Sequence, residues 1–355
     1  MATRVMMLAG GTGGHVYPAL AVAKELQARG CEVRWMGTRA GLEARVVPES
    51  GIEIDWLAVS GFRGKGWAGK FKAPFKLIVA LVQSALHLMR FRPNLVIGMG
   101  GFVAGPGGLM ARMLAMPLVV HEQNRIPGTT NRFLVRFAKT VLEAFPGSFP
   151  AGAKAVAVGN PLRRQILDVS STRARQPQDR LKVLVLGGSQ GARALNQAVP
   201  EAIGKQPDRF IVRHQTGEAM KAETERLYKE LSVHSEVKSF IEDMKAAYEW
   251  ADLAICRSGA MTVSELAAAG LPSILVPFPF AIDDHQTANA RYLADGGAAV
   301  LMPQTELNPD SLFNVLRELL EDPGRVTHMS QAARSLAHLD ATERVCDLAL
   351  AEARS

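Results

Sequence analysis

The stretch LAGGTGGHVYPAL, residues 8–20, decides the fold class, because here an apolar strand leads through a glycine-rich turn into a helix. It matches neither of two common phosphate-binding loops. A P-loop would carry Lys-Ser or Lys-Thr after its last glycine, but the first lysine of the chain is Lys24. The dinucleotide fingerprint G-x-G-x-x-G, begun at Gly11, meets Val16 at its last position. The loop is therefore a strand-to-helix turn of another kind.

The same pattern of strand, glycine turn and helix recurs in the second half, as LKVLVLGGSQGARALN at residues 181–196. Aligned on their first glycines, GGTGGH matches GGSQGA, and Ala192 stands where the first loop has His15. Each half continues with apolar runs between helical stretches: EVRWMG, NLVIGM, PLVVHE and KTVLEA, then RFIVRHQTG, VKSFI, DLAIC and PSILVP. Alternating strands and helices predict an α/β protein of two Rossmann-like domains, whose parallel sheets face each other across a cleft.

The length and the polarity of the chain predict where these domains meet. At 355 residues the chain exceeds what one ordinary core supports. The turn GNPLRR, 159–164, is expected to end the first domain, and the polar stretch SSTRARQPQDR, 170–180, to mark the joint. We therefore expect an N-terminal domain over 1–160 and a C-terminal domain over 161–339. The start, MATRVMMLAGG, is interpreted as a first strand and not as a signal peptide, because glycines cut its apolar run short.

The composition narrows the classes of partner. The residues are 48% hydrophobic and 21% charged, and the net charge is +7. A sequence pI near 9.4 favours phosphates, an anionic membrane surface or nucleic acid, or a soluble enzyme that is simply basic. Nucleic-acid binding is disfavoured, because neither an aromatic stacking surface nor a dense basic stripe is apparent. The cysteines Cys31, Cys256 and Cys346 form no CxxC pair, which suits a reducing cytosol and argues against disulfide or zinc frameworks.

His15 is the candidate for proton transfer. A histidine at the start of a helix faces the positive end of the helix dipole, which favours the neutral, base-competent imidazole. One interpretation is a general base. The other is a structural histidine that caps the helix or supports a hinge.

Two more glycine-rich stretches, 97–108 and 256–270, stand where strands should end, so these turns can converge on one ligand site. In the second, Ser258, Gly259 and Ala260 open a helix whose start suits a diphosphate, and Glu265 could reach ribose hydroxyls. The alternative is a capped helix with an acidic residue near its start.

Polar segments offer hydrogen-bonding groups but no metal motif. The segment HEQNRIPGTTNR, 121–132, could bind sugar hydroxyls or anchor a turn, and its His-Glu pair lacks the second histidine of a zinc HExxH motif. The residues DDHQ, 283–286, resemble a metal cluster only superficially, so we expect no metal site. Gln286 and Asn289, one helical turn apart, are better placed to hydrogen-bond a sugar.

Residues 65–92 raise the question of a membrane. The uncharged apolar stretch from Leu77 to Met89 is interpreted as too short and too polar to span a bilayer. Apolar residues at helical spacing and lysines at the start of the segment could instead form an interfacial face on anionic lipids, or the apolar face could belong to the core. The expected membrane face is Phe71, Phe75, Ile78 and Leu81 (with Val82), together with Lys65, Lys70, Lys72 and Lys76.

Taken together, GGTGGHVYPAL, GMGGFVAGP, HEQNRIPGTTNR, GNPLR, GGSQGA and CRSGAMTVSEL resemble the MurG family of bacterial glycosyltransferases, in order from Leu8 to about Asn289. The resemblance implies the GT-B fold, with a C-terminal helix, within about 340–355, that packs back onto the first domain. It also implies inverting, metal-independent transfer of N-acetylglucosamine from UDP-N-acetylglucosamine to the 4-hydroxyl of the muramoyl sugar of lipid I, without a cofactor. The product would be lipid II, made for peptidoglycan on the cytoplasmic face of the bacterial inner membrane.

The resemblance implies roles for individual positions. The acceptor-side loop would be Gly11, Gly13, Gly14 and His15, with His15 as the base. The backbone of Ile241 would contact uracil near Arg163, Glu265 would bind the ribose, and Ser189 would meet the diphosphate. Gln286, Asn289 and Asn124 would reach the sugar or the catalytic centre. The donor-binding set is Thr12, Gly13, Gly14, Asn124, Arg163, Ser189, Ile241, Ala260, Met261, Thr262, Val263, Ser264, Glu265, Gln286 and Asn289.

Three other functions were weighed against the residues. A dehydrogenase is rejected, because the strand CEVRWMGT does not end in the acidic residue that binds a dinucleotide ribose. A UDP-N-acetylglucosamine epimerase would share the fold and the donor but would have no use for a basic apolar face. A non-catalytic, membrane-bound nucleotide-sugar sensor could keep Glu265 and Ser189 while placing no demand on His15.

Overall fold

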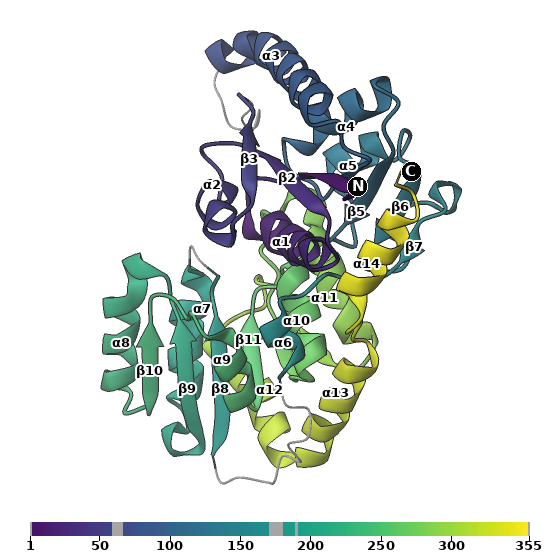
Figure 1. Cartoon of the computed structure of the whole chain (residues 1–355). Coiled ribbons are helices and arrows are strands. Elements are labelled where there is room, and N and C mark those ends of the chain that lie inside the picture. The colour runs from purple at the N-terminus through teal and green to yellow at the C-terminus, as the bar shows by residue number, and fades with distance from the viewer. Residues whose placement is uncertain (1, 59–66, 170–179, 189–190, 354–355) are drawn as a thin grey trace. The chain divides into compact units, whose positions relative to one another are not determined.

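Parallel strands alternate with helices through both halves of the chain (Figure 1). The computed structural model describes residues 2–58, 67–169, 180–188 and 191–353. These divide into two compact units, one of residues 1–163 and 338–355 and one of residues 164–337. The predicted joint at 170–180 lies almost entirely outside the described residues.

The described strands of the first unit form a seven-stranded parallel sheet in the order β3-β2-β1-β4-β5-β6-β7. Alternate residues of the central strand β1 belong to different cores: Val5 and Met7 pack on one face of the sheet, Met6 and Leu8 on the other. Both faces are therefore covered, as parallel sheets require. The strands are β1 Arg4–Leu8, β2 Glu32–Gly37, β3 Glu53–Trp56, β4 Leu95–Gly98, β5 Leu118–Glu122, β6 Thr140–Glu143 and β7 Val156–Ala157.

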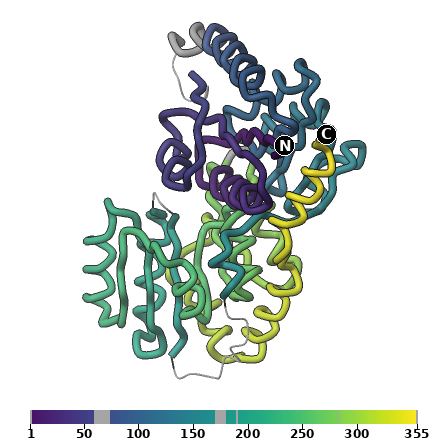
Figure 2. The backbone as a smooth tube through the Cα atoms, in the orientation of Figure 1, coloured from purple at the N-terminus to yellow at the C-terminus, as the bar shows by residue number. Residues whose placement is uncertain are grey.

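Helices cover this sheet, and the last one comes from the far end of the chain. The described helices of the first unit are α1 Gly13–Ala28, α2 Glu43–Val46, α3 Trp67–Phe91, α4 Ala104–Met113, α5 Thr129–Leu134 and α14 Ala341–Leu350, with short 3₁₀ turns at Pro48–Ser50 and Ala151–Ala153. Helix α14 places Val345, Cys346 and Ala349 in the same core as α1, and Figure 2 shows this yellow helix beside the purple one. The C-terminal segment thus completes the first unit.

The second unit repeats the topology. Its described strands form a six-stranded parallel sheet in the order β10-β9-β8-β11-β12-β13. They are β8 Leu181–Leu186, β9 Phe210–Gln215, β10 Ser235–Lys238, β11 Leu253–Cys256, β12 Ser273–Leu275 and β13 Ala299–Leu301. The helices are α6 Arg164–Leu167, α7 Arg193–Ile203, α8 Lys221–Glu230, α9 Met244–Trp250, α10 Ala260–Ala269, α11 His285–Asp295, α12 Pro309–Glu321 and α13 Pro323–Ser335, with 3₁₀ turns at Pro207–Arg209, Glu218–Met220 and Ile282–Asp284.

The predicted strands are present, with one displaced. The run VKSFI was expected as a strand, but β10 covers Ser235–Lys238 and stops before Phe240 and Ile241. The N–H of Ile241 donates instead to the side-chain Oε1 of Gln215, at 3.1 Å, so this residue leaves the ladder for a turn. All three cysteines are free.

Helix α3 is apolar on both sides, unlike an ordinary surface helix. Ala80, Ser84 and Leu88 are fully buried and pack toward the domain. Outward residues remain uncovered: Phe75 is 70% exposed, and Ile78, Val82, Leu86 and Met89 are about half exposed. Of the predicted face, Phe75, Ile78 and Val82 are exposed, whereas Leu81 is half-buried.

The apolar part of α3 is also longer than the stretch from Leu77 to Met89. By length and composition alone, the window Pro74–Phe91 is long and apolar enough to cross a membrane. Helices in the cores of soluble proteins meet the same criterion. Lys76 is exposed at the start of this window, whereas Lys65 and the side chains of Lys70, Phe71 and Lys72 lie outside what the structure describes.

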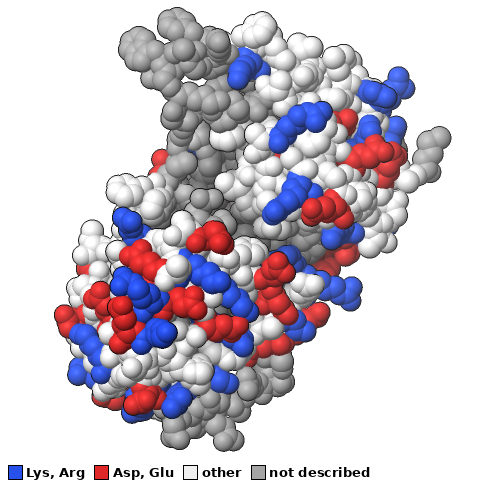
Figure 3. Space-filling view, turned by 90° about the vertical axis from the view of Figure 1, so that its left-hand side faces the viewer, with Lys and Arg blue, Asp and Glu red and all other residues white. Residues whose placement is uncertain are grey.

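Charges on the face shown in Figure 3 are mixed in sign. Acidic and basic side chains are interspersed over the second unit, and broad uncharged surface with scattered charges covers the first. Among the described residues on this face, no stripe of a single sign, which nucleic-acid binding would favour, is present.

Candidate functional site

The glycine-rich loop of the first unit ends at the first turn of α1. Thr12 has extended backbone angles and occupies the N-cap position, and its carbonyl accepts from the N–H groups of His15 and Val16 at 3.1 Å each. The Thr12 side chain makes no cap hydrogen bond, and no described residue accepts from the N–H groups of Gly13 and Gly14. Unpaired N–H groups at the positive end of a helix are suited to an anion.

A buried carboxylate, Glu43 of α2, holds this loop in place. Its Oε2 accepts from the N–H of Gly11 at 2.9 Å, while its Oε1 accepts from the N–H and Oγ1 of Thr38 at 2.9 and 2.7 Å. Glu43 is fully buried, and a Cβ at Gly10 or Gly41 would lie 2.8 or 2.1 Å from its carboxylate. Two of the glycines therefore leave room for the carboxylate that fixes the loop.

The turn after β4 meets the same loop. A Cβ at Gly101 would lie 2.1 Å from the carbonyl oxygen of Gly10, and one at Gly100 would lie 2.8 Å from Nδ1 of His15. Both residues have positive φ, 95° at Gly100 and 82° at Gly101. Within this unit the turn after β4 therefore packs directly on the first glycine-rich loop, and only glycine lets the two approach so closely.

His15 is the first member of a chain of hydrogen bonds to the end of β5. Its Nδ1 lies 2.8 Å from Oε1 of Gln123, whose Nε2 lies 3.0 Å from Nδ1 of His121. The Nε2 of His121 lies 2.9 Å from the carbonyl oxygen of Gly159. Gln123 and His121 are fully buried, and burial lowers the pKa of His121 to about 4, partly offset by its bond to Gly159.

The segment that follows β5 is folded by its own acidic residue. Oε1 of Glu122 accepts from the backbone and side-chain N–H groups of Asn124 at 2.9 and 3.1 Å. Its Oε2 accepts from the N–H of Gly128 and from Nδ2 of Asn131, at 3.1 and 2.9 Å. Of the two roles considered for HEQN, these contacts fit the turn anchor for Glu122.

Arg163 stands at the end of the first unit. Its guanidinium lies over the ring of Tyr17 in α1, 5.4 Å from the ring centroid, a distance at which cation–π attraction is effective. Its predicted place near uracil stays a prediction.

The corresponding loop of the second unit is described only in part, because Ser189 lies outside the described residues. Gly191 has a φ of 74°, and a Cβ there would lie 2.1 Å from the carbonyl oxygen of Thr216. That carbonyl also accepts from Nδ2 of Asn196 at 3.0 Å. The loop therefore packs tightly on the end of β9, as the first loop packs on its neighbours.

Behind this loop lies a buried histidine. The ring nitrogens of His214 lie 3.1 Å from Oδ1 of Asn196 and 2.9 Å from the hydroxyl of Tyr228. Burial lowers the pKa of His214 to about 3.

Helix α10 begins without a side-chain cap. Its N-cap residue is Gly259, which has no side chain to accept from the first N–H groups. Ala260, Met261 and Thr262 follow, and their N–H groups point from the helix start as an anion site requires. Val263 differs from this expectation, because its N–H donates to the carbonyl of Gly259 at 2.9 Å and its side chain is fully buried.

Glu265 and Ser264 are partly exposed on the same helix. Oε2 of Glu265 accepts from the hydroxyl of Tyr248 in α9 at 2.8 Å. This bond fixes the carboxylate from one side.

The start of α11 is tied to the loop ahead of α10. The hydroxyl of Ser258 donates to the carbonyl of Gln286 at 2.8 Å, and Nδ2 of Asn289 donates to the carbonyl of Ser258 at 3.3 Å. Oε1 of Gln286 accepts from the N–H of Phe278 at 2.9 Å. Gln286 is partly exposed, but Asn289 is fully buried, so its contact with a sugar stays a prediction.

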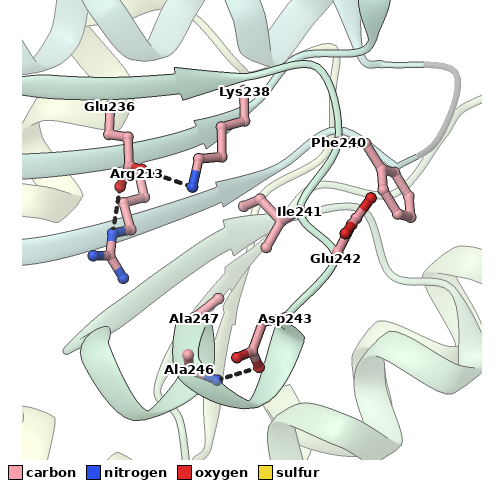
Figure 4. Close-up of a pocket in the computed structure, with 9 residues that line it drawn as sticks. All are labelled: Arg213, Glu236, Lys238, Phe240, Ile241, Glu242, Asp243, Ala246 and Ala247. Carbon is pink, nitrogen blue, oxygen red and sulfur yellow. Dashed lines mark hydrogen bonds and ion pairs between the residues drawn. The ribbon is translucent and has the colours of Figure 1, made fainter.

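A pocket of about 470 Å³ opens beside Ile241, between the ends of β9 and β10 and the start of α9 (Figure 4). On its strand side Glu236 pairs with Arg213 at 2.8 Å and with Lys238 at 2.7 Å. Asp243 accepts from the N–H of Ala246 at 2.9 Å and caps α9. The side chain of Gln215 already accepts from the N–H of Ile241. Of the two backbone polar groups of Ile241, the carbonyl is therefore the one that can bind a ligand in this pocket.

Among the residues that the structure describes, no group of three or more His, Cys, Asp or Glu side chains is arranged to hold a metal ion. The sequence did not single out Glu43, Gln215 or Tyr248. Each of these three side chains hydrogen-bonds a residue that is distant in the chain, which the sequence alone does not reveal. For Glu43, the only indication was that an acidic residue stands in the short segment after β2.

Two family models match the chain. The N-terminal domain of glycosyltransferase family 28 matches residues 5–143, and the C-terminal domain of that family matches residues 182–345. Together they cover a large part of both units.

Curated relatives match over the full length. The UDP-N-acetylglucosamine–N-acetylmuramyl-(pentapeptide) pyrophosphoryl-undecaprenol N-acetylglucosamine transferase of Methylococcus capsulatus is 61% identical, with 99% of each chain covered. The enzyme of the same name from Marinobacter nauticus is 50% identical, over 98% of this chain and 97% of that one.

Among solved structures, the crystal structure of Acinetobacter baumannii MurG has a TM-score of 0.84 at 40% identity, covering 98% of this chain and 99% of that one. A UDP-N-acetylglucosamine 2-epimerase has a TM-score of 0.67 at 15% identity, over 97% and 95% of the two chains, which shows a likeness of fold alone. The predicted α/β architecture of the GT-B type is thereby confirmed.

Proposed function

Because the chain belongs to the MurG family of N-acetylglucosaminyltransferases, within glycosyltransferase family 28, we propose that it transfers N-acetylglucosamine from UDP-N-acetylglucosamine to lipid I. Lipid I is the undecaprenyl-diphosphoryl-muramoyl-pentapeptide, and the product is lipid II, the precursor of peptidoglycan. The observation that carries this proposal is the 61% identity to a named transferase over 99% of both chains.

The first unit supplies the acceptor side of the reaction. The N–H groups at the start of α1 are suited to the diphosphate of the lipid, and His15 follows them in the first turn of the helix. His15 takes the proton of the muramoyl 4-hydroxyl. A positioned general base contributes about 10²–10⁴-fold to a rate, so the loss of His15 should slow transfer strongly.

The second unit supplies the donor side. The uncapped start of α10 meets the diphosphate of UDP through Ala260, Met261 and Thr262, and Glu265 binds the ribose hydroxyls. The pocket beside Ile241 is suited to the uracil ring, because the carbonyl of Ile241 can accept from its N3–H. Gln286 is the polar group placed for the sugar.

The bond changes define an inverting displacement. The acceptor 4-oxygen forms a bond to the anomeric carbon as the bond from that carbon to the diphosphate oxygen breaks, and the hydroxyl proton passes to His15. The electron pair leaves with UDP. We propose that helix N-termini meet this charge without a metal, as preorganised N–H dipoles can.

The outer face of α3 is proposed to hold the enzyme on the cytoplasmic face of the bacterial inner membrane. Phe75, Ile78 and Val82 are exposed on one side of a helix whose other side is buried in the domain. An exposed apolar helix face with nearby lysines is typical of a peripheral, interfacial helix.

The proposal is tested by the fate of the labelled sugar. UDP-N-acetylglucosamine labelled in its sugar is incubated with a soluble lipid I analogue and excess EDTA, and the products are separated. We expect β-linked disaccharide on the lipid. Transfer that stops in EDTA would contradict metal independence, an α-linked product would contradict inversion, and a free or epimerised sugar without disaccharide would contradict the transferase.

A further inference from the structure

The hydrogen-bond chain that runs from His15 into the domain has a direction, and that direction can be worked out from its far end. It consists of His15, Gln123, His121 and the carbonyl of Gly159. All four lie in the first unit. Each ring nitrogen in the chain can donate or accept, depending on where the proton sits.

The contact with Gly159, at the far end of the chain, determines which ring nitrogen of His121 carries the proton. A carbonyl oxygen can only accept, so the 2.9 Å contact with Gly159 requires a proton on Nε2 of His121. The ring is fully buried, and burial disfavours a second proton. Nδ1 of His121 is therefore a lone pair that needs a donor.

The acceptors of His121 in turn determine which way the side-chain amide of Gln123 is oriented. Its Nε2 lies 3.0 Å from the lone pair on Nδ1 of His121 and 3.2 Å from the backbone carbonyl of His121, so two acceptors face the same nitrogen. Turning the amide over would place an oxygen against both of them. The backbone carbonyl of Gln123 is held as well, by Nδ2 of Asn160 at 3.0 Å.

The orientation of Gln123 then determines the tautomer of His15, at the near end of the chain. Oε1 of Gln123 can only accept, and it lies 2.8 Å from Nδ1 of His15. We propose that Gln123, oriented by His121, is a positioning residue that keeps the proton of neutral His15 on Nδ1 and so presents Nε2 as the base. This inference rests on the proposed function, in which His15 accepts the acceptor proton.

The arrangement has a chemical consequence. No described residue hydrogen-bonds Nε2 of His15, so this nitrogen can receive the proton of the acceptor hydroxyl. After transfer, the imidazolium keeps its Nδ1–H bond to Gln123 and gains an N–H at Nε2. A neutral amide orients the ring without adding a negative charge beside it. Gly100 contributes by leaving the space into which the ring fits.

The tautomers can be measured without substrate. In enzyme labelled with ¹⁵N-histidine, long-range ¹H–¹⁵N spectra distinguish protonated from unprotonated ring nitrogens, and the His15→Ala variant identifies the His15 signals. We expect neutral His15 to carry its proton on Nδ1 and His121 to carry its proton on Nε2. A wild-type His15 protonated on Nε2 would overturn the proposal.

Variants test the role of Gln123. Gln123→Met removes the acceptor, so His15 should revert to the Nε2–H form that a histidine side chain favours in water. The kcat should fall about 10-fold or more, but by less than in a variant that lacks His15, because the imidazole is still present. The KM for UDP-N-acetylglucosamine should not change. In Gln123→Glu the buried carboxyl should stay protonated, because its proton replaces the amide N–H that faces the two acceptors of His121. Its other oxygen still accepts from His15, so the variant should retain the Nδ1–H form and more of kcat. Gln123→Glu also tests the proposal if Gln123→Met does not fold.

The matched control is Gln83→Met, which removes a glutamine whose Oε1 accepts from the N–H of Ala58 at 2.8 Å, elsewhere in the unit. It should leave the His15 signals and kcat unchanged. An unchanged tautomer and kcat in Gln123→Met would overturn the proposal. If the tautomer changes as expected but His15→Ala retains full activity, Gln123 does set the tautomer of His15, but His15 is not the base. A failure of this inference is therefore distinguishable from a failure of the proposed function.

Discussion

The carboxylate of Glu43 accepts a hydrogen bond from the backbone N–H of Gly11 at 2.9 Å, and thereby ties the glycine-rich loop to the segment that follows β2. The same carboxylate binds Thr38 twice. The loop therefore owes its conformation to a side chain 32 positions away as well as to its glycines.

Glu43→Ala should both destabilise the first unit and lower the transfer rate. Removing the carboxylate leaves partly buried N–H groups at Gly11 and Thr38 without an acceptor, at a cost of about 2–4 kcal/mol in the free energy of unfolding. Urea unfolding and transfer assays measure the two effects.

Glu143→Ala is the matched control for this change. Glu143 accepts from the N–H groups of Gly147 and Phe149, at 2.8 and 3.0 Å, away from the loop. It should lose similar stability but keep kcat at temperatures where the protein is folded. Equal losses of kcat in the two variants would show that Glu43 has no particular effect on the loop.

Gly100→Ala should impair catalysis by moving the imidazole of His15. The new Cβ would lie 2.8 Å from Nδ1, so the ring must shift, and misplacement of a reacting group by about 1 Å can cost about 10²-fold in rate. Steady-state kinetics should show a lower kcat with an unchanged KM for the donor.

Gly51→Ala separates this effect from backbone strain. Gly51 also has a positive φ, 74°, but nothing lies within 4 Å of its added Cβ. Both variants should lose stability, and only Gly100→Ala should lose kcat. A kcat for Gly100→Ala equal to that of Gly51→Ala would contradict the packing of His15 on Gly100.

Stability should fall on mild acidification because of two buried histidines. Burial lowers the pKa of His121 to about 4 and that of His214 to about 3, against an ordinary value of 6.5. The unfolded chain therefore binds more protons than the folded one below pH 6.5, and stability is lost as the pH falls toward these values. Each histidine contributes a slope of up to about 1.4 kcal/mol per pH unit.

Urea unfolding between pH 6.5 and about 5, above the range where most carboxylates titrate, measures this slope. The variant His214→Gln removes one of the two imidazoles and should make the curve shallower. A curve that is flat over this range in the wild type would show that neither histidine is buried in its neutral form.

Membrane binding should depend on the outer face of α3. Replacing Phe75, Ile78 and Val82 with serine removes apolar surface that contributes about 1.5–3 kcal/mol for each side chain when fully buried in lipid. Co-sedimentation with phosphatidylglycerol vesicles should fall sharply, while transfer to a water-soluble acceptor continues at the wild-type rate.

The control replaces Met113 and Phe133, which are 68% and 42% exposed elsewhere on the same unit, with serine. These variants should bind vesicles as the wild type does. A similar loss of binding in the control, or none in the α3 variant, would contradict the assignment of this face.

The fold was predictable because its signals are local. Apolar runs ending in glycine turns mark β1, β4, β8 and β11, and the repeat of GGTGGH as GGSQGA shows two units of one topology. The strand at VKSFI was misplaced because Phe240 and Ile241 have strand-like side chains, but a side-chain acceptor, Gln215, takes the backbone out of the ladder.

The candidate site was predictable only in part. His15 stood out at a helix start, but its partner Gln123 lies 108 positions away and pairs with it through tertiary structure alone. Glu43 carries no motif. On α3 the spacing predicted an apolar face, of which Phe75, Ile78 and Val82 are exposed, but packing leaves Leu81 half-buried. Which side of an apolar helix is covered depends on its neighbours, which the pattern does not specify.

The most direct test of the account is the single-turnover rate of sugar transfer by wild type and His15→Ala, measured alongside the Kd of UDP for each. The account predicts that His15→Ala loses about 10²–10⁴-fold in rate and keeps the wild-type Kd, because His15 acts on the acceptor proton and not on the donor. An unchanged transfer rate in His15→Ala would contradict it, as would a loss of rate matched by an equal loss of UDP affinity.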